Sequence, residues 1–159
     1  MADAVSTQVR SKIMRAIVSS KTGPENLLIK AFASCGLKGW RTQASTLPGT
    51  PDFIFRSQKL AIFVDGCFWH GCLSCYRRPH SHKLYWREKL RSNMARDQKN
   101  SMDLIEKGWG VLRLWEHEIR QHPADCLGLI KKALERKQLA RKVLRLLVSK
   151  SNRLSHGTK

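Results

Sequence analysis

The chain has 159 residues, which suits one folded domain and is too short for two full cores. Apolar residues make up 42% and charged residues 26%, a globular composition that excludes a disordered chain. Thirty lysines and arginines against 12 acids give a net charge of +18, so we expect a polyanionic partner. The longest apolar run, residues 60–64, is far shorter than the roughly 20 residues of a membrane span. We therefore expect no membrane contact.

Cysteine use and the start of the chain bear on location. No apolar segment follows Met1, so we expect a cytoplasmic or nucleoid protein, where thiols stay reduced. The five cysteines are an odd number, and three of them lie between Cys67 and Cys75. This clustering predicts a metal site rather than disulfides.

The N-terminal half shows an arm, a helix and three strands. Residues 1–21 are polar and basic, which predicts a basic arm or a short helix. A helix begins at Thr22, with Glu25 completing a capping box, and ends at Gly36. Strands are expected at 40–43, 52–55 and 59–65, with a proline- and glycine-rich turn before the second. The continuous apolar run of the third strand predicts burial on both faces.

The C-terminal half begins with an irregular segment, residues 67–82, rich in Cys, His, Gly and Pro. A long basic helix at 84–107, a buried strand at 111–115 and a helix opening at Pro123 follow. This order predicts an α/β fold, a small mixed sheet flanked by helices. We divide the chain into an arm at 1–21, a zinc-containing domain at 22–130 and a basic helix or tail at 131–159. The tail is expected to add non-specific affinity for nucleic acid.

Three cysteines suggest a zinc site that needs a fourth ligand. Cys72 and Cys75 have zinc-knuckle spacing, and Cys67 lies five residues before Cys72. His70 and His117 compete for the fourth position. We favour His117, because it would close a long loop, whereas His70 is separated from Cys72 by one residue. The alternative is three buried free cysteines.

Several single residues have both a chemical and a structural interpretation. Asp52 begins a strand, where a carboxylate can hold a divalent cation or simply stabilise a turn. His70, if it is not a zinc ligand, can take a proton from water or be structural. Phe68 and Trp69 can stack on or wedge between bases, or form a small core under the zinc loop. Taken locally, Glu25 is a capping residue.

One face of the long helix carries Asn93, Arg96 and Asp97 at positions i, i+3 and i+4, and the default interpretation is a solvated face.

Several segments, in order along residues 10–120, resemble the very short patch repair endonucleases. They are 10–17 (RSKIMRAI), 47–53 (LPGTPDF), 63–72 (FVDGCFWHGC), 85–89 (Tyr-Trp-x2-Lys), 93–97 (Asn-x2-Arg-Asp) and 108–117 (Gly-Trp-x-Val-Leu-x2-Trp-Glu-His). The run from Asp65 to Cys72, joined to the others, is highly specific. The tail from residue 131 lies outside the resemblance.

The resemblance implies a restriction-endonuclease-like fold with a structural zinc, and a strand-specific nickase. Such an enzyme cuts 5′ to the thymine of T:G mismatches that arise when 5-methylcytosine deaminates. By motif position, Asp52 corresponds to the carboxylate that binds the catalytic Mg²⁺, and His70 to the catalytic histidine. Glu25 and Asp97 fall on active-site positions as well. Val64 could contribute only its backbone carbonyl to the Mg²⁺ site.

The resemblance also implies Cys67, Cys72, Cys75 and His117 as zinc ligands, and Met14, Phe68 and Trp69 as residues that intercalate beside the mismatch. Implied partners are T:G-containing duplex DNA, mismatch-repair proteins and a cytosine methyltransferase system. The protein would act as a monomer in the bacterial cytoplasm, at the nucleoid. One departure concerns residues 64–66: the wider nuclease superfamily often has an acid-x-Lys there, and this chain has no lysine.

Other classes of protein fit parts of the sequence. A non-catalytic zinc-stabilised DNA-binding module explains the charge and the cysteines, but leaves Asp52 and His70 without a role. An RNA-binding protein fits the charge and the aromatic residues. A restriction-type nuclease that cuts both strands fits the fold.

Overall fold

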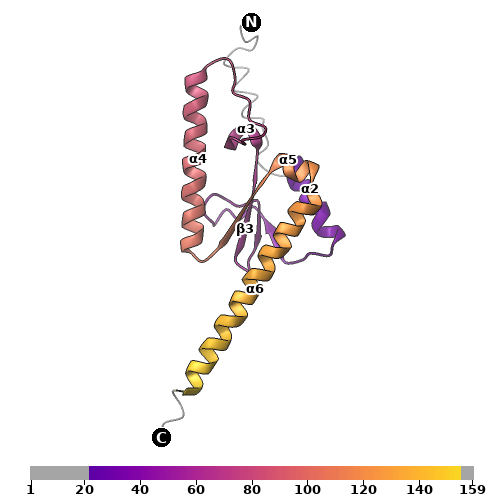
Figure 1. Ribbon diagram of the computed structural model, residues 1–159, viewed down its shortest axis with the longest axis vertical. Helices are drawn as coiled ribbons and strands as arrows, with labels where there is room; N and C mark the ends of the chain where they lie inside the picture. The colour runs from indigo at the N-terminus through magenta and orange to yellow at the C-terminus, as the bar shows by residue number, and fades with distance from the viewer. Residues whose placement is uncertain (1–21, 155–159) are drawn as a thin grey trace.

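The computed structural model describes residues 22–154, with side-chain surroundings as far as residue 140. The expected arm at 1–21, with Met14, and residues 155–159 lie outside the described residues. A four-stranded sheet lies between two helical layers, with α4 on one side and α2, α5 and α6 on the other (Figure 1). This confirms the expected α/β fold, a mixed sheet flanked by helices.

The sheet has the order β1-β2-β3-β4, formed by Trp40–Thr42, Phe53–Phe55, Leu60–Asp65 and Gly110–Trp115. The first two pairings are antiparallel and β3 pairs with β4 in parallel. A parallel pair needs a long crossover, and α4 (Lys83–Glu106) supplies it. The carboxyl ends of β3 and β4 therefore meet at the same edge, where β2 begins.

Each face of the sheet carries its own apolar cluster, because side chains alternate along a strand. On the face covered by α2, α5 and α6, the larger cluster is built around Phe32, Phe53, Ile62, Leu114 and Ile130. On the α4 face, a smaller cluster contains Ala44, Ile54, Ala61, Phe63 and Leu104. The burial of β3 on both faces confirms the interpretation of its apolar run.

Helix α2 (Gly23–Ser34) begins as its sequence predicts. The backbone N–H and the hydroxyl of Thr22 both donate to Oε1 of Glu25, at 3.2 and 2.8 Å. Leu28 and Phe32 then face the core with no solvent exposure. Glu25 is itself buried, with 4% of its surface exposed. The cap therefore places a carboxylate inside the protein.

Two short helices were not expected: α3 (Cys67–His70) lies within the segment predicted to be irregular, and α5 (Glu116–Gln121) directly follows β4. Both are too short to show helical periodicity in the sequence.

Helix α6 (Pro123–Leu154) is continuous across residue 131, where we divided domain from tail. Its first turns pack on the sheet through Cys126, Ile130 and Leu134, and its later turns extend beyond the sheet (Figure 1). Within the described residues, no helix combines the length and the apolar character needed to cross a membrane.

Candidate active site and metal centre

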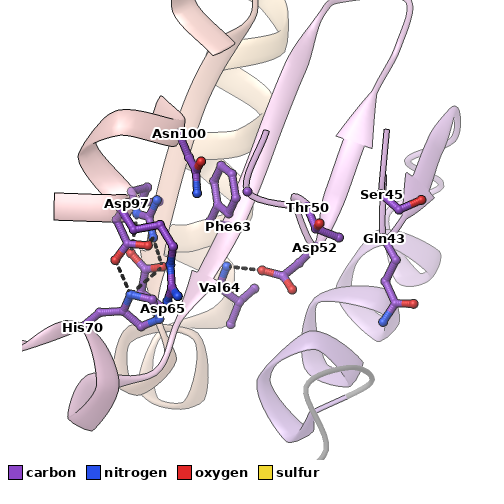
Figure 2. A pocket seen from close by; sticks show the side chains of 13 residues that line it. Gln43, Ser45, Thr50, Asp52, Phe63, Val64, Asp65, His70, Asp97 and Asn100 are labelled. Atoms are coloured by element: carbon purple, nitrogen blue, oxygen red, sulfur yellow. Dashed lines mark hydrogen bonds and ion pairs between the residues drawn. The ribbon is translucent and has the colours of Figure 1, made fainter. Parts of the chain in front are cut away.

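A cleft of about 780 Å³ opens at the sheet edge where β3 ends and β2 begins. It is lined by residues from the β1–β2 connection, β3, α3, α4 and β4. Asp52, Val64, His70 and Asp97, all singled out from the sequence, are among these lining residues. Figure 2 shows His70, Asp65 and Asp97 grouped together, with Asp52 and Val64 beside them. The fold thus brings four distant sequence segments to one opening.

Asp52 is held at the mouth of this cleft by the neighbouring strand. Its Oδ2 accepts a hydrogen bond from the backbone N–H of Val64 at 2.7 Å, and Figure 2 shows the other oxygen directed away from Val64. The preceding loop is anchored on α4, because the left-handed Gly49 lies against Asn100 and a Cβ there would come within 2.8 Å of its side chain. Asp52 is therefore a fixed carboxylate with one engaged oxygen.

The charge on Asp52 is unfavourable in the absence of a cation. Its pKa is raised to about 6, mainly by burial and to a smaller extent by the carboxylates of Glu25 and Asp65, while the hydrogen bond from the Val64 amide lowers it. Glu25 thus acts electrostatically on Asp52 although it caps α2. Several acidic groups near one partly buried carboxylate are typical of a site that accepts a divalent cation.

His70 and Asp97 form a pair across the cleft. Nδ1 of His70 lies 2.5 Å from Oδ2 of Asp97, whereas the same nitrogen lies 3.9 Å from Oδ1 of Asp65. A carboxylate accepts hydrogen bonds, so Nδ1 carries a proton in this pair and Nε2 of the neutral ring is left as the acceptor. The predicted solvated face at Asp97 is wrong for this residue, because α4 turns it towards the site.

Asp65 and Arg113 form a second ion pair in the same cleft. The guanidinium contacts both oxygens of Asp65, at 2.6 and 2.7 Å, and approaches Oδ1 of Asp97 at 3.3 Å. Asp65 therefore faces the cleft, which the sequence left open. Arg113 was missed: its only signal is a cation inside an otherwise apolar strand at 111–115.

Beside the cleft, Cys67, Cys72, Cys75 and His117 form a compact cluster. One ligand atom from each lies within 4.8 Å of all the others, and Nδ1 of His117 is 3.1 Å from Sγ of Cys67 and 3.6 Å from Sγ of Cys72. Three sulfurs and one imidazole around a common centre fit a tetrahedral zinc ion. His70 is absent from this cluster, so the geometry agrees with His117 as the fourth member.

The thiols of this cluster must lose protons to bind a cation. Without one, burial raises the pKa of Cys67 to about 12. A thiol ligand must lose its proton to bind metal, so metal binding and proton release are coupled here. The cluster joins α3 to α5, segments 50 residues apart, and can therefore hold a metal ion that stabilises the edge of the cleft.

Helix α3 carries Cys67 at one end and His70 at the other, and three contacts fix it. The Cys67 N–H donates to Oε1 of Glu116 at 2.9 Å. The helix ends at Gly71 in the left-handed conformation, where a Cβ would also lie 2.9 Å from Leu90. The side-chain amide of Asn93 donates to the Trp69 carbonyl at 2.9 Å. The position of His70 thus depends on α4 and on α5.

Phe68 and Trp69 belong to an aromatic group centred on Trp86. The ring centroid of Phe68 lies 5.0 Å from Trp69, 5.2 Å from Trp86 and 5.9 Å from Tyr76. Trp86 is buried, whereas Phe68 and Trp69 are partly exposed. The group is a small core that includes two residues of α3, and these two residues are partly exposed.

Comparisons with known proteins agree with this arrangement. The model of the family described as "DNA mismatch endonuclease Vsr" matches residues 2–77. The chain is 39% identical over 122 residues to the DNA mismatch endonuclease Vsr of Escherichia coli, covering 76% of this chain and 77% of that protein.

Two nicking enzymes are also similar. V.NaeI of Lentzea aerocolonigenes is 40% identical over 114 residues, which cover 69% of this chain and 68% of that protein. V.NmeDIP of Neisseria meningitidis serogroup C is 33% identical over 138 residues, which cover 86% and 93%. With the carboxylate and histidine cleft and the thiol cluster in place, these similarities lead to one conclusion: the chain belongs to the Vsr family of DNA mismatch endonucleases.

Proposed function

We propose that this DNA endonuclease nicks a single strand of duplex DNA, 5′ to the thymine of a T:G mismatch left by deamination of 5-methylcytosine. The observation that carries this proposal is the cleft itself. It combines a partly buried carboxylate, Asp52, with the His70–Asp97 pair in one opening, as hydrolysis of a phosphodiester requires.

Asp52 and the backbone carbonyl of Val64 are the proposed ligands of Mg²⁺. The fit rests on chemistry already described: hard oxygen donors, an elevated Asp52 pKa and the nearby acid Glu25. A bound Mg²⁺ ion would neutralise charge on the scissile phosphate and stabilise the leaving oxygen. Asp52 would hold the ion on the wall of the cleft, and Glu25 adds negative charge near it.

His70 is the proposed general base. Because its Nδ1–H is donated to Asp97, Nε2 is free to take a proton from a water molecule. The resulting hydroxide attacks phosphorus, and the bond to the leaving oxygen breaks. Asp97 holds the ring in the required tautomer and stabilises the positive charge that the ring gains.

The cluster of Cys67, Cys72, Cys75 and His117 is the proposed structural zinc site. All four positions are occupied by protein atoms, as in closed structural sites rather than catalytic ones. Zinc bound there would hold α3 against α5. His70, on the last turn of α3, would then keep its position relative to Asp97.

Recognition of the mismatch is assigned to Phe68 and Trp69, with Met14 of the undescribed arm. An aromatic ring inserted at a mismatch separates bases at lower cost than at a Watson–Crick pair, so selectivity can come from deformability. Phe68 and Trp69, both partly exposed, belong to α3 itself and precede His70, which lines the cleft. The basic segment at residues 131–159 is proposed to add contacts to phosphates.

The test uses purified protein, Mg²⁺ and duplexes that carry one T:G mismatch, each strand labelled in turn, on denaturing gels. The expected result is one cut, 5′ to the mismatched thymine, on that strand alone. The matched T:A duplex is the control. Cuts on both strands would contradict the proposal and indicate a restriction-type nuclease. Binding without any cut would contradict it and indicate a non-catalytic DNA-binding module.

A further inference from the structure

Arg113 forms the centre of a charged network that the proposed chemistry does not use. It comes from β4, whose other residues are apolar. Its Nε and Nη2 bind the two oxygens of Asp65, and its guanidinium carbon lies 4.7 Å from the centroid of the Phe63 ring. A guanidinium group that is hydrogen-bonded to two carboxylate oxygens and stacked on an aromatic ring has little freedom to move.

The same guanidinium also reaches the catalytic pair. Nη2 of Arg113 lies 3.3 Å from Oδ1 of Asp97, while Nδ1 of His70 contacts the other oxygen, Oδ2. The Asp97 carboxylate is therefore held at both oxygens by different partners. Without the Arg113 contact, this carboxylate would be free to rotate about its side-chain bond, and the orientation of His70 would follow.

We propose that Arg113 is a positioning residue for nicking, which fixes the Asp97 carboxylate on His70, and that Asp65 anchors Arg113. The proposal rests on the proposed roles of His70 and Asp97. It also assigns Asp65: both of its oxygens are engaged by Arg113, so Asp65 acts through the arginine rather than as a ligand of the catalytic cation.

A purely stabilising role explains the network less well. Buried ion pairs contribute little net stability, because desolvation offsets most of the attraction. Arg113 also has a cost of its own, since Nη1 is buried without a hydrogen-bond partner among the residues that the structure describes. Hydrophobic residues in place of both Arg113 and Asp65 would avoid both costs. The network is better explained by what it does for Asp97.

The main test is Arg113→Lys, which keeps a positive charge beside Asp65 but lacks the fork needed to hold two carboxylates. Single-turnover nicking should fall about 10–100-fold, the usual loss when a group that orients a functional ligand is removed. Affinity for the T:G duplex and zinc content should stay at the wild-type level. Arg56→Lys, an exposed residue in the β2–β3 turn, is the matched control and should nick normally.

Two further measurements separate positioning from structure. In the Asp97→Asn background, Arg113→Lys should cost no more than about twofold, because residues that act through one another are not additive. Arg113→Ala should regain nicking when guanidinium chloride is added, but not with sodium chloride at the same concentration. Equal, independent losses in the two backgrounds, or full nicking by Arg113→Lys, would overturn the proposal.

A readout without nicking keeps the two proposals distinguishable. The low-field NMR signal of the His70 Nδ1 proton, identified by its loss in His70→Gln, reports the contact with Asp97. It should broaden or disappear in Arg113→Lys and persist in Arg56→Lys. Failure of the wild type to nick, with this pattern intact, would count against the proposed function alone. An unchanged signal in Arg113→Lys would count against the positioning role.

Discussion

The thiol cluster and the carboxylate cleft lie at opposite ends of one four-residue helix, and they differ in almost every chemical respect. The cluster offers three soft sulfurs and one imidazole that meet at a point. The cleft offers hard oxygens and a histidine around an open space of about 780 Å³. A closed set of four protein ligands suits a structural ion, whereas an open site leaves room for substrate.

Because of this difference, we expect the cluster to determine mainly the stability of the protein and the cleft to determine mainly its nicking activity. Helix α3 carries Cys67 into the cluster and His70 into the cleft, so a metal in the first site would orient a base in the second. Changes in the cluster are expected to act on folding of the edge and, through it, on nicking. Changes in the cleft are expected to act on nicking without loss of stability or of zinc.

Asp52→Ala should give the largest effect on nicking. It removes the carboxylate proposed to hold Mg²⁺, and loss of single catalytic groups costs about 10²–10⁴-fold in rate. Single-turnover rates on the T:G duplex measure this. Duplex affinity and zinc content, measured on the same preparation, should stay near the wild-type values, because phosphate contacts supply most of the affinity. Near-native nicking by Asp52→Ala would end the nuclease interpretation of this cleft.

Cys72→Ser tests the thiol cluster in the same way. One sulfur of the cluster is lost, so the zinc should dissociate and the edge that holds α3 should unfold. We expect loss of metal, a melting temperature lower by several degrees and nicking reduced together with stability. Cys35→Ser, at an exposed cysteine outside the cluster, is the matched control. Retention of stoichiometric zinc by Cys72→Ser would contradict the site.

Phe68→Ala should leave both sites intact and change selectivity. The T:G preference over matched DNA should fall by about tenfold, since unstacking one base step costs a few kcal/mol that the ring helps to offset. Competition between T:G and T:A duplexes in single-turnover nicking measures this preference. Because Phe68 also packs on Trp86, folding is checked by melting. An unchanged preference in a folded variant would remove Phe68 from mismatch recognition.

Asp52→Asn should make the Mg²⁺-free protein more stable while inactivating it. The pKa of Asp52 is raised from 3.8 to about 6, mainly by burial, so the cost of its ionisation to folding grows from about pH 4 and is fully present above pH 6. Removing that charge should add about 1–2 kcal/mol at pH 7, and the advantage should shrink as the pH falls from 6 to 4. Thermal or urea unfolding against pH measures it. If Asp52→Asn were less stable than the wild type at pH 7, the ionised Asp52 side chain would not destabilise the Mg²⁺-free protein, and the prediction would be wrong.

The sequence predicted the thiol cluster better than the cleft, for a physical reason. Cys67, Cys72 and Cys75 are close along the chain, and their spacing alone suggests a shared metal. Asp52, His70 and Asp97 meet only because β2, α3 and α4 converge at one sheet edge, which no local pattern reveals. Their assignment came from resemblance to a family, not from periodicity.

Other features could be predicted neither from local sequence patterns nor from the resemblance to a family. Arg113 interrupts an apolar strand, but only the pairing of β3 with β4 shows that it faces Asp65. Glu25 was correctly predicted as a cap, and its influence on Asp52 depends on how α2 packs against the sheet. The strands were predicted to within about one residue because they are apolar and bounded by turn residues.

One paired measurement tests the separation of the two sites most directly: zinc content and single-turnover nicking of His70→Ala beside His117→Ala. Both variants replace a histidine by alanine: His70 lies in the cleft and His117 in the thiol cluster. The account predicts that His70→Ala keeps its zinc and duplex affinity while losing nicking by about 10²–10⁴-fold. His117→Ala should lose zinc. Release of zinc from His70→Ala, with zinc retained in His117→Ala, would contradict it and place His70 among the metal ligands.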